Sequence, residues 1–342
     1  MEQATKSNYN GALQHPIGSG FTAASTADEV LKGIDLTGKV AIVTGGYAGL
    51  GLETVRAFSA AGATVIIPVR DRKKAEANLK GIKNVTIETM DLMDPASIDA
   101  FATKFLATHK ALHILVNNAG IMWVPLRRDA AGNESQLATN HFGHFRLTAR
   151  LWPALKNAKG ARVVNVSSWG HHRSDFHFED PNFEHRAYDS FEGYGQSKTA
   201  NILFTVELDE RGKQYGVRSY TLHPGSIVDT DLKREIDPGM LIQLGVHDKD
   251  GNTILDATRG MKTIAQGAST QVWCAAHPAL HDLGGVYCEN NEVAVIDTTY
   301  QGWRPEDGSL RGVMAYSLDR EHAQKLWTLT EQMTGVTFDV TN

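Results

Sequence analysis

Two side chains at helical spacing suggest proton-transfer chemistry in this chain. Tyr194 and Lys198 are four residues apart in the segment YGQSKTANILFTVEL. If residues 194–210 form a helix, both side chains leave the same face. A neighbouring ammonium group stabilises a phenolate, whose reference pKa is about 10, so that Tyr194 can act as a general acid or base. Taken alone, such a pair is more often a surface packing pair than a catalytic one.

A serine at the end of an apolar run adds a hydrogen-bond donor to this pair. Ser168 ends the run RVVNVSS and precedes Tyr194 by 26 residues. Its hydroxyl can donate to a substrate oxygen and stabilise negative charge that develops there. The three side chains together indicate acid–base catalysis on an oxygen-bearing substrate.

A glycine-rich segment, TGGYAGLG at 44–51, predicts a binding loop for phosphate groups. Gly45 permits a tight turn, Gly49 lets the backbone approach a pyrophosphate, and Gly51 lets the following helix pack close to the sheet. The helix N-terminus then presents unpaired N–H groups to the anion. A plain structural turn is the alternative, but the β-branched run before the loop and the helical periodicity after it favour a dinucleotide.

These residues need a scaffold, and the pattern of the chain predicts an α/β fold. Short β-branched runs alternate with helical periodicity, which is typical of a doubly wound parallel sheet with helices on both faces. Ligands bind beyond the carboxyl ends of such strands, where all the motifs above fall. The runs are VAIVTGG at 40–46, TVIIPV at 64–69, VTIETMD at 85–91, ILVNNAG at 114–120, RVVNVSS at 162–168, VRSYTLHPG at 217–225 and GVYCEN at 285–290.

Composition favours a small-molecule partner and excludes several other classes. The chain has 342 residues, of which 42% are hydrophobic and 21% charged, and its net charge is -5. This balance predicts no binding to nucleic acid and no attraction to an anionic membrane. Cys274 and Cys288 are too few for a disulfide framework, which favours a reducing, cytoplasmic location. No stretch has the apolar length of a signal peptide or a membrane span.

We expect one domain with an extension at each end. Residues 1–36 are predicted to form an extended arm with a short helix at 25–32, capped by Ser25 or Thr26. Residues 37–300 form the expected catalytic domain. Residues 301–342 are expected to be a C-terminal extension that packs on the same domain.

Two long segments, 169–193 and 231–263, interrupt the alternation and are interpreted as lids, with plain surface connections as the alternative. The aromatic side chains of the first segment either line a pocket for a bulky apolar substrate or pack the loop down. Its histidines predict no metal site, because no H-E-x-x-H spacing or complete ligand set is present. The residues concerned are Trp169, His171, His172, Phe176, His177, Phe178, Phe183 and His185.

The G-x-x-x-G-x-G spacing resembles the short-chain dehydrogenase/reductase superfamily, and further motifs extend the resemblance over residues 37–295. Within that superfamily, the HH-containing loop, the ANILFTVEL helix and the AQKLWTLTEQMTG helix resemble the retinol dehydrogenase and WW-domain oxidoreductase branch, although no WW domain is present. The supporting motifs are Asn117-Asn118-Ala119-Gly120, Asn140 within NHFGHF, Ser168 at the end of VVNVSS, Tyr194-Gly195-Gln196-Ser197-Lys198 and Pro224-Gly225.

The resemblance implies a Rossmann-type oxidoreductase that interconverts a ketone or aldehyde and an alcohol by hydride transfer, with carbonyl reduction favoured. It assigns catalysis to Asn140, Ser168, Tyr194 and Lys198, with Asn140 supporting a water relay to Lys198 or, alternatively, bonding its own helix backbone. Ser167 is the less favoured serine. The implied cofactor residues are Gly45, Tyr47, Ala48, Gly49, Leu50, Gly51, Arg70, Asp91, Leu92, Asn118, Ala119, Gly120, Tyr194, Lys198, Pro224, Gly225 and Thr230.

The residues after the second strand favour NADP(H) over NAD(H). Arg70 stands where the family often places its selector, and a guanidinium pairs with a 2′-phosphate. Alternatively, Arg70 and Arg72 are ordinary solvated charges and Asp71 receives a ribose hydroxyl. An oxidised nicotinamide ring next to Tyr194 would lower its pKa further.

Three other expectations follow from the resemblance. A homodimer or homotetramer is implied, although the terminal extensions could block or build an interface. The separation of 26 residues between Ser168 and Tyr194 exceeds that of simpler members and affects the shape of the substrate pocket. Two alternatives remain open, namely a catalytically inactive dinucleotide sensor or interaction protein and an NAD-dependent secondary-alcohol dehydrogenase.

Overall fold

An eight-stranded sheet forms the middle layer of the computed structural model, which describes residues 6–227, 230, 232, 236–302 and 311–341. The strand order is β3-β2-β1-β4-β5-β6-β7-β8, and every pair is parallel except β7 with β8. The predicted doubly wound fold is therefore confirmed. The strands are β1 (Val40–Val43), β2 (Thr64–Val69), β3 (Val85–Thr89), β4 (Ile114–Asn117), β5 (Ala161–Val166), β6 (Val217–His223), β7 (Val286–Glu289) and β8 (Glu292–Val293).

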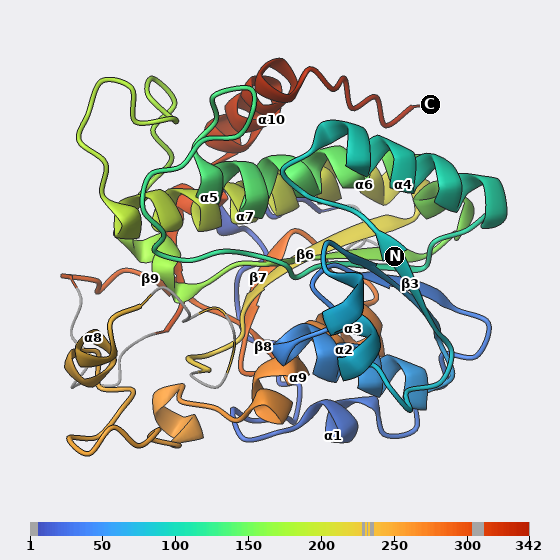
Figure 1. The fold of residues 1–342 in the computed structure, drawn as a ribbon, viewed down its shortest axis with the longest axis horizontal. Coiled ribbons are helices and arrows are strands. Elements are labelled where there is room, and N and C mark those ends of the chain that lie inside the picture. Colours follow the sequence, from blue (N-terminus) through green and yellow to red (C-terminus); the bar gives the residue numbers. More distant parts are fainter. Residues whose placement is uncertain (1–5, 228–229, 231, 233–235, 303–310, 342) are drawn as a thin grey trace.

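Helices cover both faces of this sheet, which explains why the central strands are apolar along their length. In Figure 1, α4, α6 and α7 lie on one face with α10 outside them, and α2, α3 and α9 lie on the other with α1 outside. The bounds are α1 (Ala27–Leu31), α2 (Gly49–Ala60), α3 (Arg72–Asn78), α4 (Pro95–Thr108), α5 (Ser135–Leu137), α6 (Gly143–Asn157), α7 (Ser190–Gly212), α8 (Pro238–Gln243), α9 (Ile264–Ala276) and α10 (Arg320–Thr334).

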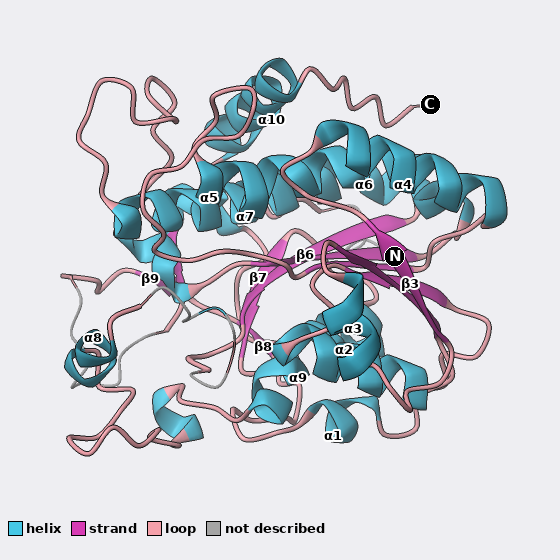
Figure 2. Ribbon diagram, viewed as in Figure 1, coloured by secondary structure: helices cyan, strands magenta, loops and turns pink. Residues whose placement is uncertain are grey.

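Within the described residues, the antiparallel strand β8 is the one strand of the eight-stranded sheet that the seven predicted runs did not include. Asn290 and Asn291 both have positive φ, 54° and 62°, and form a tight turn between β7 and β8. Two left-handed residues are what a two-residue hairpin loop requires, and asparagine tolerates that conformation. The asparagine pair therefore reverses the chain at the edge of the sheet, between the strands β7 and β8 that Figure 2 labels.

The predicted N-terminal arm packs along β7 and β8. Asn8 donates to Gly285 O at 2.7 Å, and Gln14 donates to Tyr287 O at 2.6 Å. Its short helix, α1, begins after Thr26, whose side chain forms a capping box, whereas Ser25 does not cap. Residues 1–5 of the predicted arm lie outside the described residues.

The C-terminal extension packs on the same domain. Helix α10 lies against α7, and a small separate sheet pairs β9 (Ile296–Asp297) with β10 (Val313–Met314) in parallel. Trp152 Nε1 donates to Val340 O at 2.9 Å, which ties the end of the chain to α6. Residues 303–310 and 342 of this predicted extension lie outside the described residues.

Helix α7 carries the predicted Tyr/Lys pair and begins four residues earlier than expected. Asp189 caps it by accepting hydrogen bonds from Phe191 N at 2.7 Å and Glu192 N at 3.1 Å. Tyr194 therefore lies in the second turn, where the backbone is held by its own helical hydrogen bonds. Within the described ranges, no helix is both long and apolar enough to span a membrane.

Candidate active site

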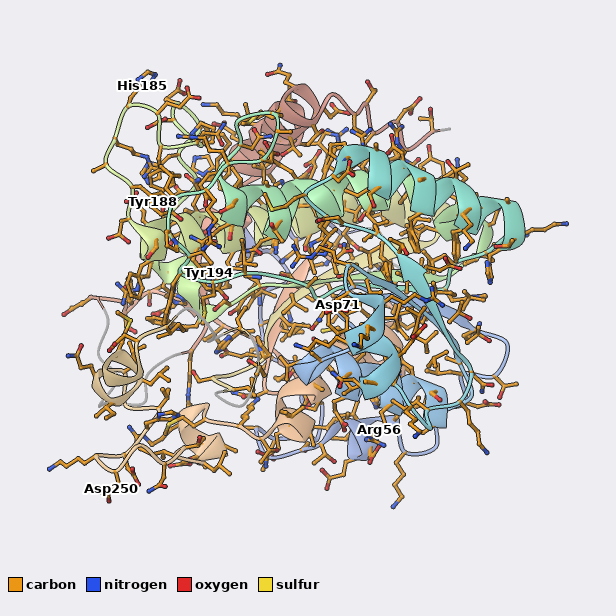
Figure 3. The ribbon with its side chains drawn as sticks, viewed as in Figure 1. Arg56, Asp71, His185, Tyr188, Tyr194 and Asp250 are labelled. Atoms are coloured by element: carbon orange, nitrogen blue, oxygen red, sulfur yellow. The ribbon has the colours of Figure 1, made fainter. Side chains whose placement is uncertain are left out.

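A cleft lies at the carboxyl ends of the parallel strands. All the cofactor residues that the sequence implied contribute to its lining. Ser168, Tyr194 and Lys198 line it as well, whereas Asn140 lies behind the lining. Figure 3 labels Tyr194 on α7 and Asp71 just before α3, which belong to the segments predicted to carry the catalytic pair and to meet the adenosine ribose.

The glycine loop packs directly on the turn that follows β4. A Cβ atom at Gly51 would lie 2.4 Å from the carbonyl oxygen of Gly45 and 2.7 Å from Nδ2 of Asn118. Gly45 itself has φ +65°, which a residue with a side chain adopts only with strain. Side chains are therefore excluded at Gly45 and Gly51, and both residues line the cleft.

Thr44, the first residue of the predicted loop, and His144, which the sequence pattern did not single out, connect this loop to α6. Thr44 Oγ1 accepts hydrogen bonds from Asn118 N at 2.9 Å and Ala119 N at 3.0 Å, and lies 2.9 Å from His144 Nε2. His144 Nδ1 lies 3.0 Å from the carbonyl oxygen of Asn140, and burial lowers the pKa of His144 to about 4. The neutral ring thus donates to Asn140 O, and the i, i+4 spacing within NHFGHF could have indicated this contact.

Asn140 holds the turn after β4 against α7. It lies in a π-helical turn, Ala138–Phe142, a feature that often occurs at functional sites. Its Oδ1 accepts from Ile121 N at 2.9 Å, and its Nδ2 donates to Ile121 O at 3.0 Å and Ser197 Oγ at 2.9 Å. The side chain therefore does not bond the backbone of its own helix, and the water relay stays a prediction.

Ser168 and Tyr194 lie on either side of one glycine. Ser168 Oγ accepts a hydrogen bond from Gly170 N at 3.0 Å. A Cβ atom at Gly170 would lie 2.8 Å from Cε1 of Tyr194 and 3.3 Å from Ser168 Oγ. The turn that begins at Ser168 therefore closes over the Tyr194 ring, and only glycine permits this approach.

Lys198 and Ser167 are held by backbone contacts next to this pair. Lys198 Nζ donates to Val166 O at 3.0 Å and lies 5.5 Å from the centroid of the Tyr194 ring. Ser167 Oγ donates to Lys198 O at 2.9 Å, so its hydroxyl is engaged with α7. The two neighbouring serines thus differ in partner, because successive residues of an extended strand point to opposite sides.

Burial controls the ionisation of both residues of the pair. It raises the pKa of Tyr194 to about 12, although a hydrogen bond with Ser168 acts in the opposite direction. Burial also lowers the pKa of Lys198 to about 7. The protein groups alone therefore do not bring the phenol toward neutral pH, because a dry site disfavours the charged form of each group.

The segment after β2 distinguishes Arg70 from its neighbours. Asp71 Oδ1 accepts from Lys74 N at 3.0 Å and so caps α3, and Arg72 Nε pairs with Glu76 at 2.8 Å. Arg70 is exposed, lines the cleft and has no hydrogen bond or ion pair within the described part of the chain. Its guanidinium is the cation of this segment that faces the cleft.

The aromatic wall of the cleft comes mainly from residues that the sequence interpretation did not choose. Trp123 and Phe191 line the cleft with ring centroids 4.6 Å apart, and Trp123 also meets the Tyr194 ring at 6.4 Å. Of the loop residues predicted as a wall, Trp169 lines the cleft. The others pack the loop down, which was the alternative interpretation, and they are His171, His172, Phe176, Phe178 and Phe183.

The backbone of Trp123 explains why the pattern did not reveal it. Trp123 has φ +55°, in the left-handed region that is uncommon for a bulky residue. The backbone N–H of Trp123 donates to Oε1 of the buried Gln136 at 2.8 Å, and Gln136 Nε2 donates to Ser190 O at 2.9 Å. A contact across 13 residues of sequence thus turns this indole toward the cleft.

The second predicted lid segment, 231–263, borders the cleft with apolar side chains, although its residues 231 and 233–235 lie outside the described residues. Thr230, just before it, packs over the glycine loop, because a Cβ atom at Gly49 would lie 3.1 Å from Thr230 Cγ2. The lining residues of the segment are Leu232, Ile236, Leu241, Leu244 and Val246.

Three histidines of the 169–193 segment contact different partners. His172 Nε2 lies 3.2 Å from Asp297, His177 Nε2 lies 2.9 Å from Glu192, and His171 bonds backbone atoms. Figure 3 labels His185 far from Tyr194, at the edge of the molecule. Across the described ranges, no three His, Cys, Asp or Glu side chains are grouped as a metal site.

Comparison with known proteins identifies the family. The family model of the short chain dehydrogenases matches residues 39–240. A "Probable oxidoreductase" of Streptomyces antibioticus is 45% identical over 301 residues, which cover 86% of this chain and 97% of that protein. "Retinol dehydrogenase 11" of Mus musculus is 38% identical over 275 residues, covering 79% and 82% of the two chains.

Solved structures agree with these relatives. A crystal structure of an uncharacterized protein from Mycobacterium Paratuberculosis superimposes with a TM-score of 0.68 at 31% identity. The match covers 93% of this chain and 99% of that chain. The predicted resemblance to the retinol dehydrogenase-like branch is thus confirmed, and this chain belongs to the short-chain dehydrogenase family of oxidoreductases.

Proposed function

We propose that the protein interconverts a ketone or aldehyde and an alcohol with NADP(H), with Tyr194 as the general acid or base and reduction as the favoured direction. The observation that carries this proposal is the meeting of Ser168 and Tyr194 across Gly170, with Lys198 Nζ 5.5 Å from the same phenol ring. An ordered acid beside a second hydroxyl donor is what carbonyl reduction requires.

The residues around the glycine loop fit a dinucleotide. A Cβ atom at Gly51 would lie 2.4 Å from Gly45 O, so glycine allows the loop and α2 to pack closely, and the N-terminus of α2 lines the cleft. Thr44, Asn118 and Ala119 hold the loop in place through hydrogen bonds. When bound, the reduced cofactor supplies a hydride to the carbonyl carbon.

The chain's own residues supply the proton and orient the substrate. With its pKa at about 12, Tyr194 carries its proton at neutral pH and can donate it to the substrate oxygen, which favours reduction. The Ser168 hydroxyl donates to the same oxygen and stabilises its developing charge. Lys198 donates a hydrogen bond to Val166 O. In its ammonium form, Lys198 stabilises the phenolate that forms when Tyr194 gives up its proton.

Turnover of a substrate panel tests this proposal. Purified protein with NADPH or NADH is mixed with aromatic ketones and aldehydes, and cofactor oxidation is followed at 340 nm. Retinaldehyde belongs in the panel because of the relatives named retinol dehydrogenase, and its product is followed by chromatography. Oxidation of NADPH that depends on the carbonyl supports the proposal, whereas tight cofactor binding without any turnover supports a dinucleotide sensor.

Arg70→Ala is expected to weaken NADPH binding about 10- to 150-fold and to leave NADH binding nearly unchanged. The range corresponds to a charge-assisted contact of about 1.5–3 kcal/mol with the 2′-phosphate. Arg70 lines the cleft, whereas Asp71 already caps α3. Fluorescence titration of both cofactors measures the two dissociation constants.

Arg72→Ala is the matched control for this experiment. Arg72 is also an exposed arginine of this segment, but it pairs with Glu76 and does not line the cleft. Its removal should leave both dissociation constants within about twofold, since exposed ion pairs contribute about 0–1 kcal/mol. Equal weakening of NADPH and NADH in Arg70→Ala would show that Arg70 is not the selector.

Trp123→Ala is expected to lower kcat/KM for a bulky aryl ketone about 2- to 10-fold and to leave a small aldehyde unaffected. Loss of an aromatic contact of about 0.5–1.5 kcal/mol gives this range. Phe178→Ala is the control, because Phe178 belongs to the 169–193 loop but packs on Phe176 away from the cleft. Equal losses with large and small substrates would contradict a role for Trp123 in substrate size.

The family resemblance also leads us to propose a homodimer or homotetramer. Light scattering of the purified chain at several concentrations measures the mass of the particle directly. A particle of 37.4 kDa at all concentrations would contradict an oligomer.

A further inference from the structure

A buried histidine joins the turn that carries Ser168 to the C-terminal part of the chain. His171 has no solvent exposure, and its Nδ1 lies 2.7 Å from the carbonyl oxygen of Ser168. On the other side of the ring, the backbone N–H of Met314 in β10 donates to Nε2 at 3.1 Å. One imidazole thus spans the space between the active-site turn and a strand 143 residues further along the chain.

The two contacts determine the protonation of this ring. A carbonyl oxygen only accepts, so Nδ1 must carry the hydrogen, and a backbone N–H only donates, so Nε2 must keep its lone pair. Complete burial lowers the pKa of His171 well below its usual value of 6.5, which keeps the ring neutral. His171 therefore has one tautomer with both ring nitrogens satisfied.

Further contacts connect the same turn to the C-terminal segments. The hydroxyl of Tyr316 donates to the carbonyl oxygen of His171 at 2.6 Å. His172 Nε2 lies 3.2 Å from Oδ2 of Asp297, which is in β9, the partner of β10. Two residues of the 3-10 turn Trp169–Arg173 therefore contact residues that lie beyond the segment matched by the family model.

We propose that His171 is a positioning residue, which orients the Ser168 hydroxyl for catalysis by anchoring the Ser168 turn to β10. The inference rests on the proposed role of Ser168 in carbonyl reduction. Gly170 lies between Ser168 and His171 and against the Tyr194 ring, so movement of the turn moves the serine relative to the phenol. Misplacement of a reacting group by about 1 Å can cost about 10²-fold in rate, which makes such an anchor effective.

Three variants and one control test the anchor. His171→Leu removes both ring contacts, and His171→Asn keeps a side-chain N–H close to the position of Nδ1 but loses the acceptor for Met314. Tyr316→Phe removes the hydroxyl above His171 without changing the turn itself. Tyr9→Phe is its matched control, because Tyr9 is also half-buried and its hydroxyl also makes a 2.6 Å hydrogen bond, to Glu207.

We expect kcat to fall about 10- to 100-fold in His171→Leu and about 2- to 10-fold in Tyr316→Phe, with His171→Asn between His171→Leu and the wild type. The dissociation constant of NADPH should stay within about twofold, because the glycine loop is untouched. Hydrogen exchange should quicken in residues 168–174 of the three variants and stay unchanged in residues 44–51. Tyr9→Phe should lower the melting temperature without changing kcat.

Two results would overturn the proposal. The first is unchanged kcat in both His171→Leu and Tyr316→Phe when the wild type reduces a carbonyl. The second is unchanged exchange in residues 168–174, which needs no substrate and therefore judges the anchor even if the wild type proves inactive. Inactivity of the wild type would instead count against the proposed function. If His171→Leu does not fold, Tyr316→Phe and His171→Asn still decide the question.

Discussion

Replacement of Tyr194 by phenylalanine is expected to lower kcat for carbonyl reduction about 10²- to 10⁴-fold, the range that general acid–base catalysis contributes. The phenol is buried and protonated at neutral pH, with a pKa of about 12, and it is the acid that lies next to Ser168. The dissociation constant of NADPH should stay nearly the same, since the glycine loop does not contact this hydroxyl. Steady-state rates at 340 nm and fluorescence titration measure the two effects separately.

Tyr220→Phe is the matched control for this substitution. Tyr220 is another fully buried tyrosine, in β6, and its hydroxyl donates to Leu280 O at 2.9 Å outside the cleft. Loss of that bond should lower stability by about 1 kcal/mol and leave kcat unchanged. If Tyr194→Phe kept most of the activity, the assignment of the general acid would be wrong.

Gly51→Ala is expected to lower the affinity for NADPH at least about tenfold. A Cβ atom at this position would lie 2.4 Å from Gly45 O, and a backbone atom cannot move aside as a flexible side chain can. The loop and helix α2 must therefore separate, which displaces the N–H groups expected to face the pyrophosphate. Overpacking of this kind also costs about 1–3 kcal/mol of stability. The melting temperature of the variant is therefore measured together with its affinity for NADPH.

Gly212→Ala is a control that distinguishes the loss of stability from the loss of NADPH affinity. Gly212 lies in α7 far along the chain from Tyr194, and a Cβ atom there would lie 3.0 Å from Val217 O and 3.1 Å from the Trp152 ring. This substitution should lower the melting temperature without changing the affinity for NADPH. Equal affinity losses in the two variants would mean that the glycine loop has no special role in binding.

The strands could be predicted from the sequence because each is a local apolar run. Residues 40–46, 64–69 and 114–120 all contain the strands observed there, and the motifs follow at their carboxyl ends. A parallel sheet brings those ends together whatever lies between them, so distant motifs could be placed in one cleft. The hairpin to β8 was missed, since its two left-handed asparagines form a signal of only two residues.

The substrate side of the cleft could not be predicted in the same way. The aromatic residues of the 169–193 loop were plausible wall residues, yet Phe176 and Phe183 are buried in the packing of that loop. Trp123 takes the wall position because Gln136 holds its backbone in a left-handed conformation. Such a contact depends on two segments meeting in space, which periodicity does not report.

The sequence by itself therefore determined the sheet, the glycine loop and the identity of the Tyr194 and Lys198 pair, because turn chemistry and helical spacing are local properties. Only the tertiary structure decided how that pair is held and ionised. Burial sets the two pKa values, and His171 joins the Ser168 turn to Met314. These properties arise from desolvation and from hydrogen bonds between distant segments, which exist only after the chain has packed.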